Sequence, residues 1–255
     1  MIWSAANLRD LDIICVRPSE VVYAFLSLTG EPSAIDEALL DDDEQVRSRG
    51  FVRAQDRRRF VMAHVALRLF LGRCLGVEHS SVRYERGING KPHLMPGLPS
   101  LEFNLSHSAG LGLIAVARDR SVGVDVEHVR DIPDAPNIAD AFFSVEEQRN
   151  LRSVSSHERP GAFFRSWTCR EALIKATGEG LGGLSDELDA SHAGDSSSSP
   201  TRNGDPCGAT SGWLSRDLPS PPGYAAAGAV AMQGDTHPRW RELSFDDPGV
   251  SRTNR

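Results

Sequence analysis

The stretch Val122-Gly-Val-Asp-Val-Glu127 alternates strictly between valines and the residues Gly123, Asp125 and Glu127. Successive side chains of a strand point to opposite faces, so this pattern predicts a strand that carries both carboxylates on one face. The continuous apolar run 111–117, just upstream, predicts a buried neighbouring strand. We therefore expect Asp125 and Glu127 to lie side by side on a sheet, close to its core.

Helices are expected on both sides of these strands along the sequence. Apolar residues recur at helical spacing over 55–75, and a capping box begins a short helix at Ser144. A longer helix is expected over 160–178, and the segments 213–218 and 224–232 read as a final pair of strands. The chain thus mixes helices and strands throughout its length.

Length and charge set the first limits on function. The chain has 255 residues and a mass of 27.7 kDa, enough for one large domain or two small ones. Its 28 basic and 35 acidic residues give a net charge of −7. An extended nucleic-acid interface needs a basic surface, so this balance argues against nucleic acid as a partner. The same net charge is compatible with a local basic site that binds one small polyanion.

Neither a membrane anchor nor a secretory leader is expected. No apolar run approaches the roughly 18 residues of a membrane span, and the first ten residues lack the basic start of a signal peptide. The four cysteines, Cys15, Cys74, Cys169 and Cys207, are scattered and form no CxxC pair. Such spacing favours reduced thiols and hence a cytoplasmic protein.

The carboxylate pair Asp125 and Glu127 allows two interpretations. On an exposed strand edge, the two acids are simply solvated. If the strand is buried, the mutual repulsion of two anions must be offset, and a hard divalent cation such as Mg²⁺ does so with carboxylate and phosphate oxygens.

A second candidate is the segment Trp167-Thr-Cys-Arg-Glu-Ala-Leu-Ile-Lys175. Glu171 and Lys175 stand four residues apart, so they share one face of the expected helix. They form either an ordinary surface ion pair or, given the apolar neighbours Phe163 and Phe164, a pair that lines a cleft. The basic residues of the chain are nearly all arginine, and Lys175 is one of only two lysines. A lysine retained in such a chain points to a role that arginine cannot fill.

Three weaker signals accompany these two. The turn around Lys91, the other lysine, is either a plain turn or a close backbone approach to a ligand. Ser106 and His107 are either structural residues or phosphate donors, since the GxSxG elbow of a hydrolase is absent. The arginines between Arg47 and Arg59 are either a solvated helix face or a pocket for an anionic group.

The order of these segments is more specific than any one of them. Gly90-Lys-Pro92, Phe103-Asn-Leu-Ser-His-Ser108, Gly123-Val-Asp-Val-Glu127 and the segment 167–175 follow one another along the chain. This order resembles the surfactin-type 4′-phosphopantetheinyl transferase family over residues 40–184. The stretch 221–227 is similar to that family's closing strand.

The resemblance implies an α+β fold with two similar subdomains, related by a pseudo-twofold axis, and an active site in the cleft between them. Residues 1–119 would form the N-terminal subdomain, on the 3′-phosphate and adenine side. Residues 120–255 would form the C-terminal subdomain, with the metal and the catalytic helix. Within it we expect a flexible loop at 191–212 and a loose tail at 234–255. Shorter relatives trimerise, whereas this chain already holds two halves, so a monomer is expected.

The resemblance also implies an activity. Family members transfer the 4′-phosphopantetheine arm of coenzyme A to a serine of an apo acyl or peptidyl carrier protein and release adenosine 3′,5′-bisphosphate, with Mg²⁺ as cofactor. Two alternatives remain open: a non-catalytic scaffold that binds coenzyme A, and an Mg²⁺-dependent hydrolase of nucleotide pyrophosphates. Which carrier is served, in fatty acid, polyketide or peptide synthesis, is left open by the sequence.

Roles for individual residues follow from the same resemblance. Asp125, Glu127 and Glu171 would bind the Mg²⁺, and Lys175 would hold the pyrophosphate. The general base is Glu171 in the favoured interpretation, with Glu127 or a metal-bound water as alternatives. The residues expected to bind coenzyme A are Arg47, Arg59, Gly90, Lys91, Pro92, Ser106, His107 and Lys175. Arg170 departs from the family, which commonly has lysine there, and a second basic residue near Glu44 is missing.

Overall fold

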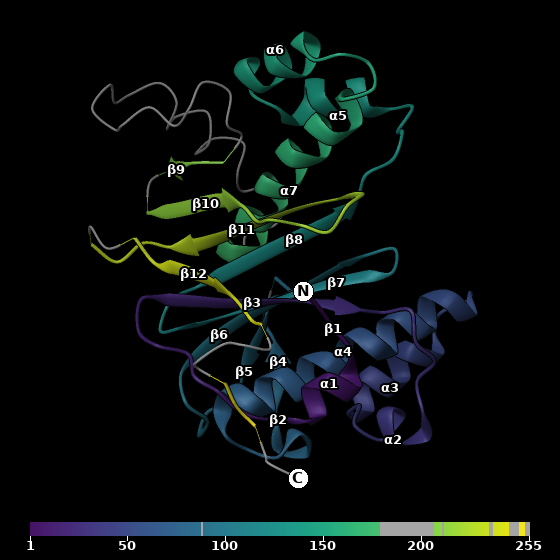
Figure 1. Cartoon of the computed structure of the whole chain (residues 1–255), viewed down its shortest axis with the longest axis vertical. Helices are drawn as coiled ribbons and strands as arrows, with labels where there is room; N and C mark the ends of the chain where they lie inside the picture. Colours follow the sequence, from purple (N-terminus) through teal and green to yellow (C-terminus); the bar gives the residue numbers. More distant parts are fainter. Residues whose placement is uncertain (88, 179–206, 211, 235–236, 245–249, 253–255) are drawn as a thin grey trace. The chain divides into compact units, whose positions relative to one another are not determined.

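A computed structural model describes the chain except for residues 88, 179–206, 211, 235–236, 245–249 and 253–255. The chain divides into two compact units. Unit 1 consists of Met1–Gly87, Pro92–Asp119 and Pro238–Arg255, and unit 2 consists of Ile88–Lys91 and Arg120–His237. Each unit combines a sheet with helices, so the predicted α+β class with two parts is confirmed (Figure 1). The pseudo-twofold relation between the parts stays a prediction.

Unit 1 is built on one mixed sheet with the strand order β1-β3-β7-β6, and β12 also pairs with β3. Strands β3, β6 and β7 are antiparallel neighbours, whereas β1 and β12 pair with β3 in parallel. In chain order the elements are β1 (Ile2–Trp3), α1 (Ala5–Arg9), β2 (Leu11–Ile14), β3 (Glu20–Ser27), α2 (Ala34–Glu37), α3 (Asp42–Arg49), α4 (Ala54–Leu75), a 3-10 turn (His79–Ser81), β4 (Tyr84–Arg86), β5 (Pro92–Leu94), β6 (Leu101–Ser108), β7 (Leu111–Arg118), β12 (Arg239–Glu242) and β13 (Val250–Arg252).

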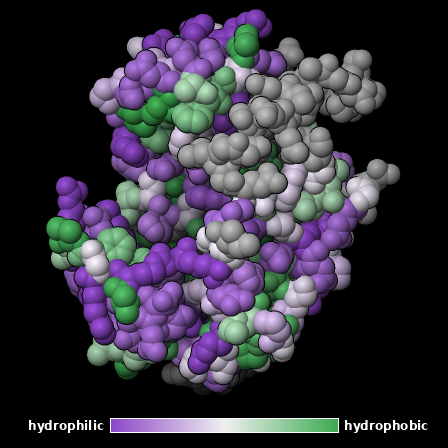
Figure 2. All heavy atoms as spheres, turned by 180° about the vertical axis from the view of Figure 1, so that it is seen from behind, coloured by the Kyte–Doolittle hydropathy of each residue, from purple (hydrophilic) through white to green (hydrophobic). Residues whose placement is uncertain are grey.

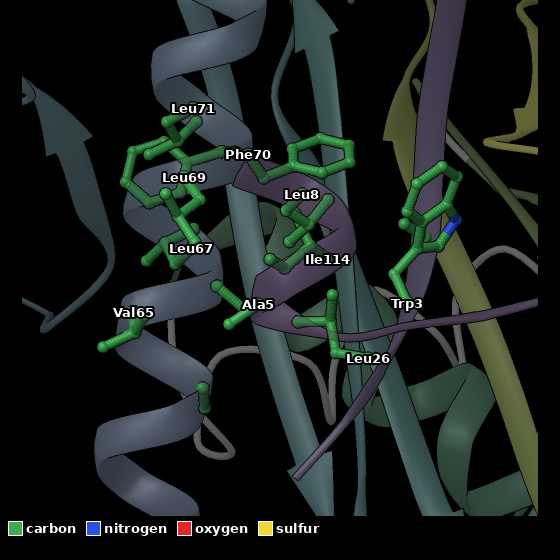
Figure 3. Packing of buried hydrophobic residues seen from close by; sticks show 14 of the residues in the cluster. Trp3, Ala5, Leu8, Leu26, Val65, Leu67, Leu69, Phe70, Leu71 and Ile114 are labelled. Carbon is green, nitrogen blue, oxygen red and sulfur yellow. The ribbon is translucent and has the colours of Figure 1, made fainter. Parts of the chain in front are cut away.

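Helix α4 forms the core of unit 1 with this sheet. Its periodic apolar residues are buried, and Figure 3 shows Phe70 of α4 pointing towards Leu8 of α1. Gly76 ends the helix with a φ of 69°, a left-handed conformation that favours glycine. The helix predicted for residues 55–75 is therefore confirmed.

A buried polar network joins α3, α4 and β4 beneath this core. Glu44 is 2% exposed and Arg68 1% exposed, and the Arg68 Nε donates to Glu44 Oε2 at 2.7 Å. His64 Nδ1 lies 2.8 Å from Glu44 Oε1, and the Tyr84 hydroxyl donates to the same oxygen. Asp41 completes the network by capping α3 and by pairing with Arg68. Each buried charge thus has an opposite charge or a donor beside it, as burial requires.

The loose tail predicted for 234–255 is wrong where the structure describes it. Strand β12 pairs with β3, and Leu243 behind it is fully buried. The Trp3 Nε1 donates to the Leu243 carbonyl at 3.0 Å, and Arg241 Nε donates to Glu20 Oε1 at 2.9 Å. The stretch from residue 238 therefore belongs to unit 1, although the sequence places it after unit 2. The polar composition of this stretch predicted a loose tail. The stretch instead forms a strand whose polar side chains make ion pairs.

Unit 2 is an antiparallel sheet in the order β8-β11-β10-β9, with helix α7 packed on one face (Figure 1). Helices α5 and α6 lie beside the N-terminal part of α7, around an apolar cluster that includes Phe143 and Phe163. The elements are β8 (Val122–His128), α5 (Ala135–Phe142), α6 (Val145–Ser153), α7 (Arg159–Thr177), β9 (Ala209–Thr210), β10 (Trp213–Asp217) and β11 (Tyr224–Ala231). The predicted strands and helices of this half are confirmed. Most of the flexible loop predicted at 191–212 lies outside the described residues.

The expectation of four reduced thiols is wrong in one respect. Cys169 of α7 and Cys207, just before β9, form a disulfide. Their Cα atoms are 5.6 Å apart, a normal separation for a disulfide, although the sequence separation is 38. Cys15 and Cys74 are free. Scattered positions in the sequence say nothing about such a pairing, which only the fold creates.

Over the described residues, no helix is both long and apolar enough to cross a membrane. On the face drawn in Figure 2, hydrophilic side chains dominate and apolar side chains are dispersed among them.

Candidate active site

The four residues predicted to carry the chemistry lie on two neighbouring elements of unit 2. Asp125 and Glu127 are on β8, and Glu171 and Lys175 are on α7. Asp125 is 3% exposed, whereas the other three are half-buried. The solvated strand edge is thereby excluded for Asp125, and the interpretation of a buried acidic strand holds.

Small residues let α7 come close to the carboxylate-bearing face of β8. Gly123, Asp125 and Glu127 share this face, and in the register they stand opposite Ala229, Ala227 and Ala225 of β11. A Cβ added at Gly123 would lie closer than 3.0 Å to the Ala172 carbonyl oxygen and the Ala176 amide nitrogen of α7. The helix backbone therefore rests directly on Gly123. This contact fixes the height of α7 above Asp125 and Glu127.

Lys175 links the two elements. Its Nζ donates to Asp125 Oδ1 at 2.6 Å, across from α7 to β8. The surface ion pair with Glu171, one of the two interpretations of the i, i+4 spacing, is therefore not what positions this ammonium. Lys175 instead supplies a positive charge to the buried end of the acidic site.

Glu171 is held in a neighbourhood that disfavours its charge. Burial raises the pKa of Glu171, Lys175 opposes that shift, and the negative charges of Asp125 and Glu127 raise the pKa further. Glu127 also has a basic neighbour, because its Oε2 lies 3.6 Å from Arg130 Nη1. The three carboxylates thus act on one another electrostatically, and a proton or a cation at Glu171 relieves the repulsion.

The donor set fits a magnesium ion better than a softer metal. Asp125, Glu127 and Glu171 offer carboxylate oxygens, which are the ligands of hard divalent cations. Their mutual repulsion is the electrostatic condition that such a cation satisfies. In the described part of the chain, the one group of three potential ligand atoms within 4.8 Å of one another is Cys169, Cys207 and Asp217. The carboxylate oxygens of Asp125, Glu127 and Glu171 are therefore not all within 4.8 Å of one another.

Arg170, where the family commonly has lysine, has a structural partner. Its Nη2 donates to Glu147, and its guanidinium carbon lies 5.7 Å from the centre of the Phe143 ring. Glu147 is also the capping-box residue of α6, so the pair fastens α6 to α7. Arg170 keeps the positive charge of the family's lysine and uses it in the ion pair with Glu147.

The arginines predicted to bind the nucleotide, Arg47 and Arg59, lie in unit 1. Arg47 is exposed at the end of α3, with its guanidinium carbon 4.9 Å from the centre of the Phe60 ring. Partial desolvation of its guanidinium and the neighbouring charge of Arg86 lower the pKa of Arg47. Arg59 pairs loosely with Asp56 at 3.7 Å. Sequence reasoning missed Arg86, because a single arginine in the short strand β4 carries no pattern that ties it to α3.

Ser106 and His107 do not act as one pair. They are successive residues of β6, so their side chains point to opposite faces of the sheet. Ser106 is 6% exposed and His107 is exposed. Any ligand contact of these two side chains must therefore come from two different sides of the strand.

The turn at Gly90-Lys91-Pro92 is divided between the units. Gly90 has a φ of 80°, a left-handed conformation that favours glycine. Lys91 belongs to unit 2, where its Nζ donates to the Ala176 carbonyl at 2.7 Å, whereas Pro92 begins β5 of unit 1. The lysine of this turn is thus fastened to the C-terminal end of α7.

Comparison with known families covers both units. The model of the 4'-phosphopantetheinyl transferase superfamily matches residues 121–229. The model of the 4'-phosphopantetheinyl transferase N-terminal domain matches residues 33–119. Together the two matches contain all the residues predicted for the site.

Individual relatives match over shorter stretches. The chain is 41% identical over 149 residues to the 4'-phosphopantetheinyl transferase HetI of Nostoc sp., a match that covers 58% of this chain and 63% of HetI. It is 36% identical over 126 residues to psf-1 of Bacillus pumilus, covering 49% of this chain and 52% of psf-1. It is 28% identical over 160 residues to Sfp of Bacillus subtilis, covering 63% of this chain and 70% of Sfp. HetI and psf-1 are thus matched over less than two thirds of their length. Both halves of this chain nevertheless match models of one family, and the chain belongs to the 4'-phosphopantetheinyl transferase superfamily.

Proposed function

We propose that the protein transfers the 4′-phosphopantetheine arm of coenzyme A to a serine hydroxyl of an apo carrier protein and releases adenosine 3′,5′-bisphosphate. The observation that carries this proposal is the seating of α7 on Gly123, which brings Glu171 and Lys175 to the strand that bears Asp125 and Glu127. Three carboxylates and one ammonium beside each other suit a reaction at a pyrophosphate.

The transfer makes one phosphorus–oxygen bond and breaks another. The serine oxygen attacks the phosphorus atom that bears the pantetheine arm, and a phosphodiester forms. The bond from that phosphorus to the bridging oxygen breaks, and this oxygen leaves on the 5′-phosphate of adenosine 3′,5′-bisphosphate. The serine proton passes to a base, directly or through a water.

Glu171 is the base that we favour, with Glu127 or a metal-bound water as the alternatives. Its raised pKa makes its carboxylate a better proton acceptor than an ordinary surface glutamate. It is half-buried on a rigid helix, so its carboxylate is held in place for the approaching hydroxyl.

The ammonium of Lys175 is suited to stabilise the negative charge of the leaving group. This ammonium, which donates to Asp125, is a compact charge that can also hold the oxygens of the pyrophosphate. Asp125 in turn orients that ammonium from the buried side of the site.

Asp125, Glu127 and Glu171 would hold the magnesium ion. When bound, this ion neutralises the charge that develops on the pyrophosphate oxygens. Burial and the negative charges of Asp125 and Glu127 raise the pKa of Glu171, and a cation held by these carboxylates would offset that repulsion.

For the nucleotide, we propose that the residues Arg47, Arg59, Gly90, Pro92 and His107 form the binding surface for the 3′-phosphate and the adenine, and that Lys91 and Ser106 contribute to it through backbone atoms only, because their side chains are directed elsewhere. Arg86 joins this set, because its charge acts on Arg47 and a phosphate between two arginines relieves their repulsion. The partner is an acyl or peptidyl carrier protein, and the protein acts in the cytoplasm as a monomer.

Mass spectrometry of apo carriers tests the proposal. Carriers of fatty acid, polyketide and peptide synthesis are incubated separately with coenzyme A, Mg²⁺ and the protein. A mass gain of one phosphopantetheine arm on at least one carrier is expected. Binding of coenzyme A without any carrier gain would favour the scaffold, and phosphopantetheine released into solution without a carrier would favour the hydrolase.

A further inference from the structure

We propose that Lys91 is a positioning residue that braces the C-terminal end of the catalytic helix α7 against the start of β8. The inference deepens the proposed function and rests on it for the catalytic consequence. It concerns the lysine of the Gly90-Lys91-Pro92 turn, which the family resemblance placed on the adenine side of the ligand.

The contacts converge on one carbonyl. Lys91 Nζ donates to the Ala176 carbonyl oxygen at 2.7 Å and to the Ser121 hydroxyl. The Ser121 hydroxyl donates to the same Ala176 carbonyl at 2.8 Å. Gly178 then ends the helix with a φ of 76°, and a Cβ built there would touch the methylene groups of Lys91 at 3.5 and 3.8 Å. The lysine side chain therefore lies along the last turn of α7 with its charge at the helix end.

The chemistry of this end favours a lysine. The last carbonyl groups of a helix lack intrahelical partners and carry partial negative charge, so a cation there is stabilising. An ammonium is compact and donates in three directions, which allows it to bind two oxygens that lie close together. Lys91 and Lys175 are the two lysines of this chain; Lys91 contacts α7 and the residue that precedes β8, and Lys175 links α7 to β8.

The brace acts on the residues that carry the reaction. Ala176 follows Lys175, and its amide nitrogen is one of the atoms that rest on Gly123. Ser121 immediately precedes β8, two residues before Gly123. The link through Lys91 thus ties α7 to β8 at one end of the interface, and the bond from Lys175 to Asp125 ties them again within it. Without Lys91, the last turn of α7 has one fewer contact to hold Lys175 over Asp125.

Hydrogen exchange measures the brace without reference to catalysis. The full chain is compared with Lys91→Met, which keeps the apolar stem, and with Lys91→Arg, which keeps the charge. Arg149→Met, an exposed arginine on α6, is the matched control. We expect exchange of the amides in Ala172–Thr177 to rise about tenfold or more in Lys91→Met, less in Lys91→Arg and not at all in the control.

The catalytic consequence is tested on the same proteins. A positioning role predicts that kcat for carrier loading falls about tenfold or more in Lys91→Met, while the Kd for coenzyme A by calorimetry changes less than about threefold. Ser121→Ala, which removes the second donor to Ala176, is expected to change kcat in the same direction.

The outcomes separate the two proposals. Unchanged exchange at the end of α7 in Lys91→Met overturns the brace. A large rise in Kd with an unchanged kcat also overturns it and makes Lys91 a ligand of coenzyme A. Faster exchange in Lys91→Met, with no carrier loading by the unaltered protein, supports the brace and refutes the proposed function.

Discussion

Gly123 of β8 lies directly beneath Ala172 of α7, so closely that a Cβ on Gly123 would lie within 3.0 Å of the Ala172 carbonyl oxygen. The position of such a Cβ would be fixed by the backbone of Gly123, and the Ala172 oxygen is itself a backbone atom. A change of side-chain rotamer therefore cannot relieve the clash that a Cβ would make. Helix α7 and strand β8 are therefore in backbone contact at this glycine. The spacing of Glu171 and Lys175 from Asp125 depends on the absence of a side chain there.

Gly123→Ala is expected to push α7 away from β8. Overpacking of this kind costs about 1–3 kcal/mol of unfolding free energy, and carrier loading should fall with it because the site residues separate. Gly161→Ala, in the first turn of the same helix with nothing within 4 Å of the added Cβ, is the control and should be neutral or slightly stabilising. Urea unfolding and carrier loading are measured for both variants. Full activity in Gly123→Ala would contradict the proposed geometry.

Glu171→Gln is expected to lower carrier loading by about 10²–10⁴-fold, because the amide can neither accept the serine proton nor bind a cation as a carboxylate does. The fold should be unchanged, since glutamine fills the same volume. Glu146→Gln, at an exposed position of α6, provides the matched control. Single-turnover loading and circular dichroism are the measurements. A Glu171→Gln variant with normal activity would exclude this residue as base and as metal ligand.

Much of the site could be predicted from the sequence, because local patterns encode it. The alternation over 122–127 places Asp125 and Glu127 on one face, and the i, i+4 spacing does the same for Glu171 and Lys175. Each pattern lies within one element, so its geometry follows from the strand or helix alone. The pairing of Lys175 with Asp125 crosses between elements, and no local pattern contains it.

The features that the sequence did not predict depend on contacts between residues that are far apart in the chain. The tail strand β12 joins β3 across more than two hundred residues, and its polar composition resembled that of a loose end. The disulfide from Cys169 to Cys207 and the effect of Arg86 on Arg47 have the same origin. In each case the partner is chosen by the fold. The composition of the sequence and the spacing of its residues therefore do not indicate that partner.

Acid is expected to destabilise unit 1 through Glu44. Burial alone would raise the pKa of Glu44, but His64, Arg68 and Tyr84 outweigh it and lower the pKa to about 2. A carboxyl with a depressed folded-state pKa stabilises the protein above its unfolded value of about 4.5 and loses that contribution as the pH falls towards 2. The contribution is on the order of 3 kcal/mol. Unfolding free energy is measured from pH 6 to pH 2.

The comparison protein for this measurement is Glu44→Gln. It should be less stable than the unaltered chain at pH 6, with a smaller loss between pH 4.5 and pH 2. Glu78→Gln, which changes an exposed side chain, should leave the profile unaltered. Equal pH profiles for the Glu44→Gln variant and the unaltered protein would rule out the network as a source of acid sensitivity.

Reduction is expected to lower the stability of unit 2. The Cys169–Cys207 bond spans a sequence separation of 38, for which the loss of chain entropy in the unfolded state corresponds to about 4 kcal/mol. A thiol reductant should therefore lower the melting temperature, and the double variant Cys169→Ser with Cys207→Ser should no longer respond to it. Cys74→Ser, which alters a buried free thiol, should still respond. Alkylation of both Cys169 and Cys207 in the untreated, unfolded protein would show that the bond is absent.

Arg86→Met is expected to weaken the binding of coenzyme A while leaving the chemical step intact. Arg86 and Arg47 are like charges in one neighbourhood, and a 3′-phosphate between them would gain a charge-assisted hydrogen bond from each. Loss of one such bond raises the Kd about tenfold or more, whereas kcat at saturating coenzyme A should hold. The decisive comparison is with 3′-dephospho-coenzyme A, whose affinity should be the same for Arg86→Met and the unaltered protein, because the group that Arg86 contacts is missing. Arg83→Met, on an exposed residue just before β4, controls for the general loss of positive charge. If both ligands weaken equally in Arg86→Met, the arginine acts through the overall field of unit 1 and has no specific contact with the 3′-phosphate.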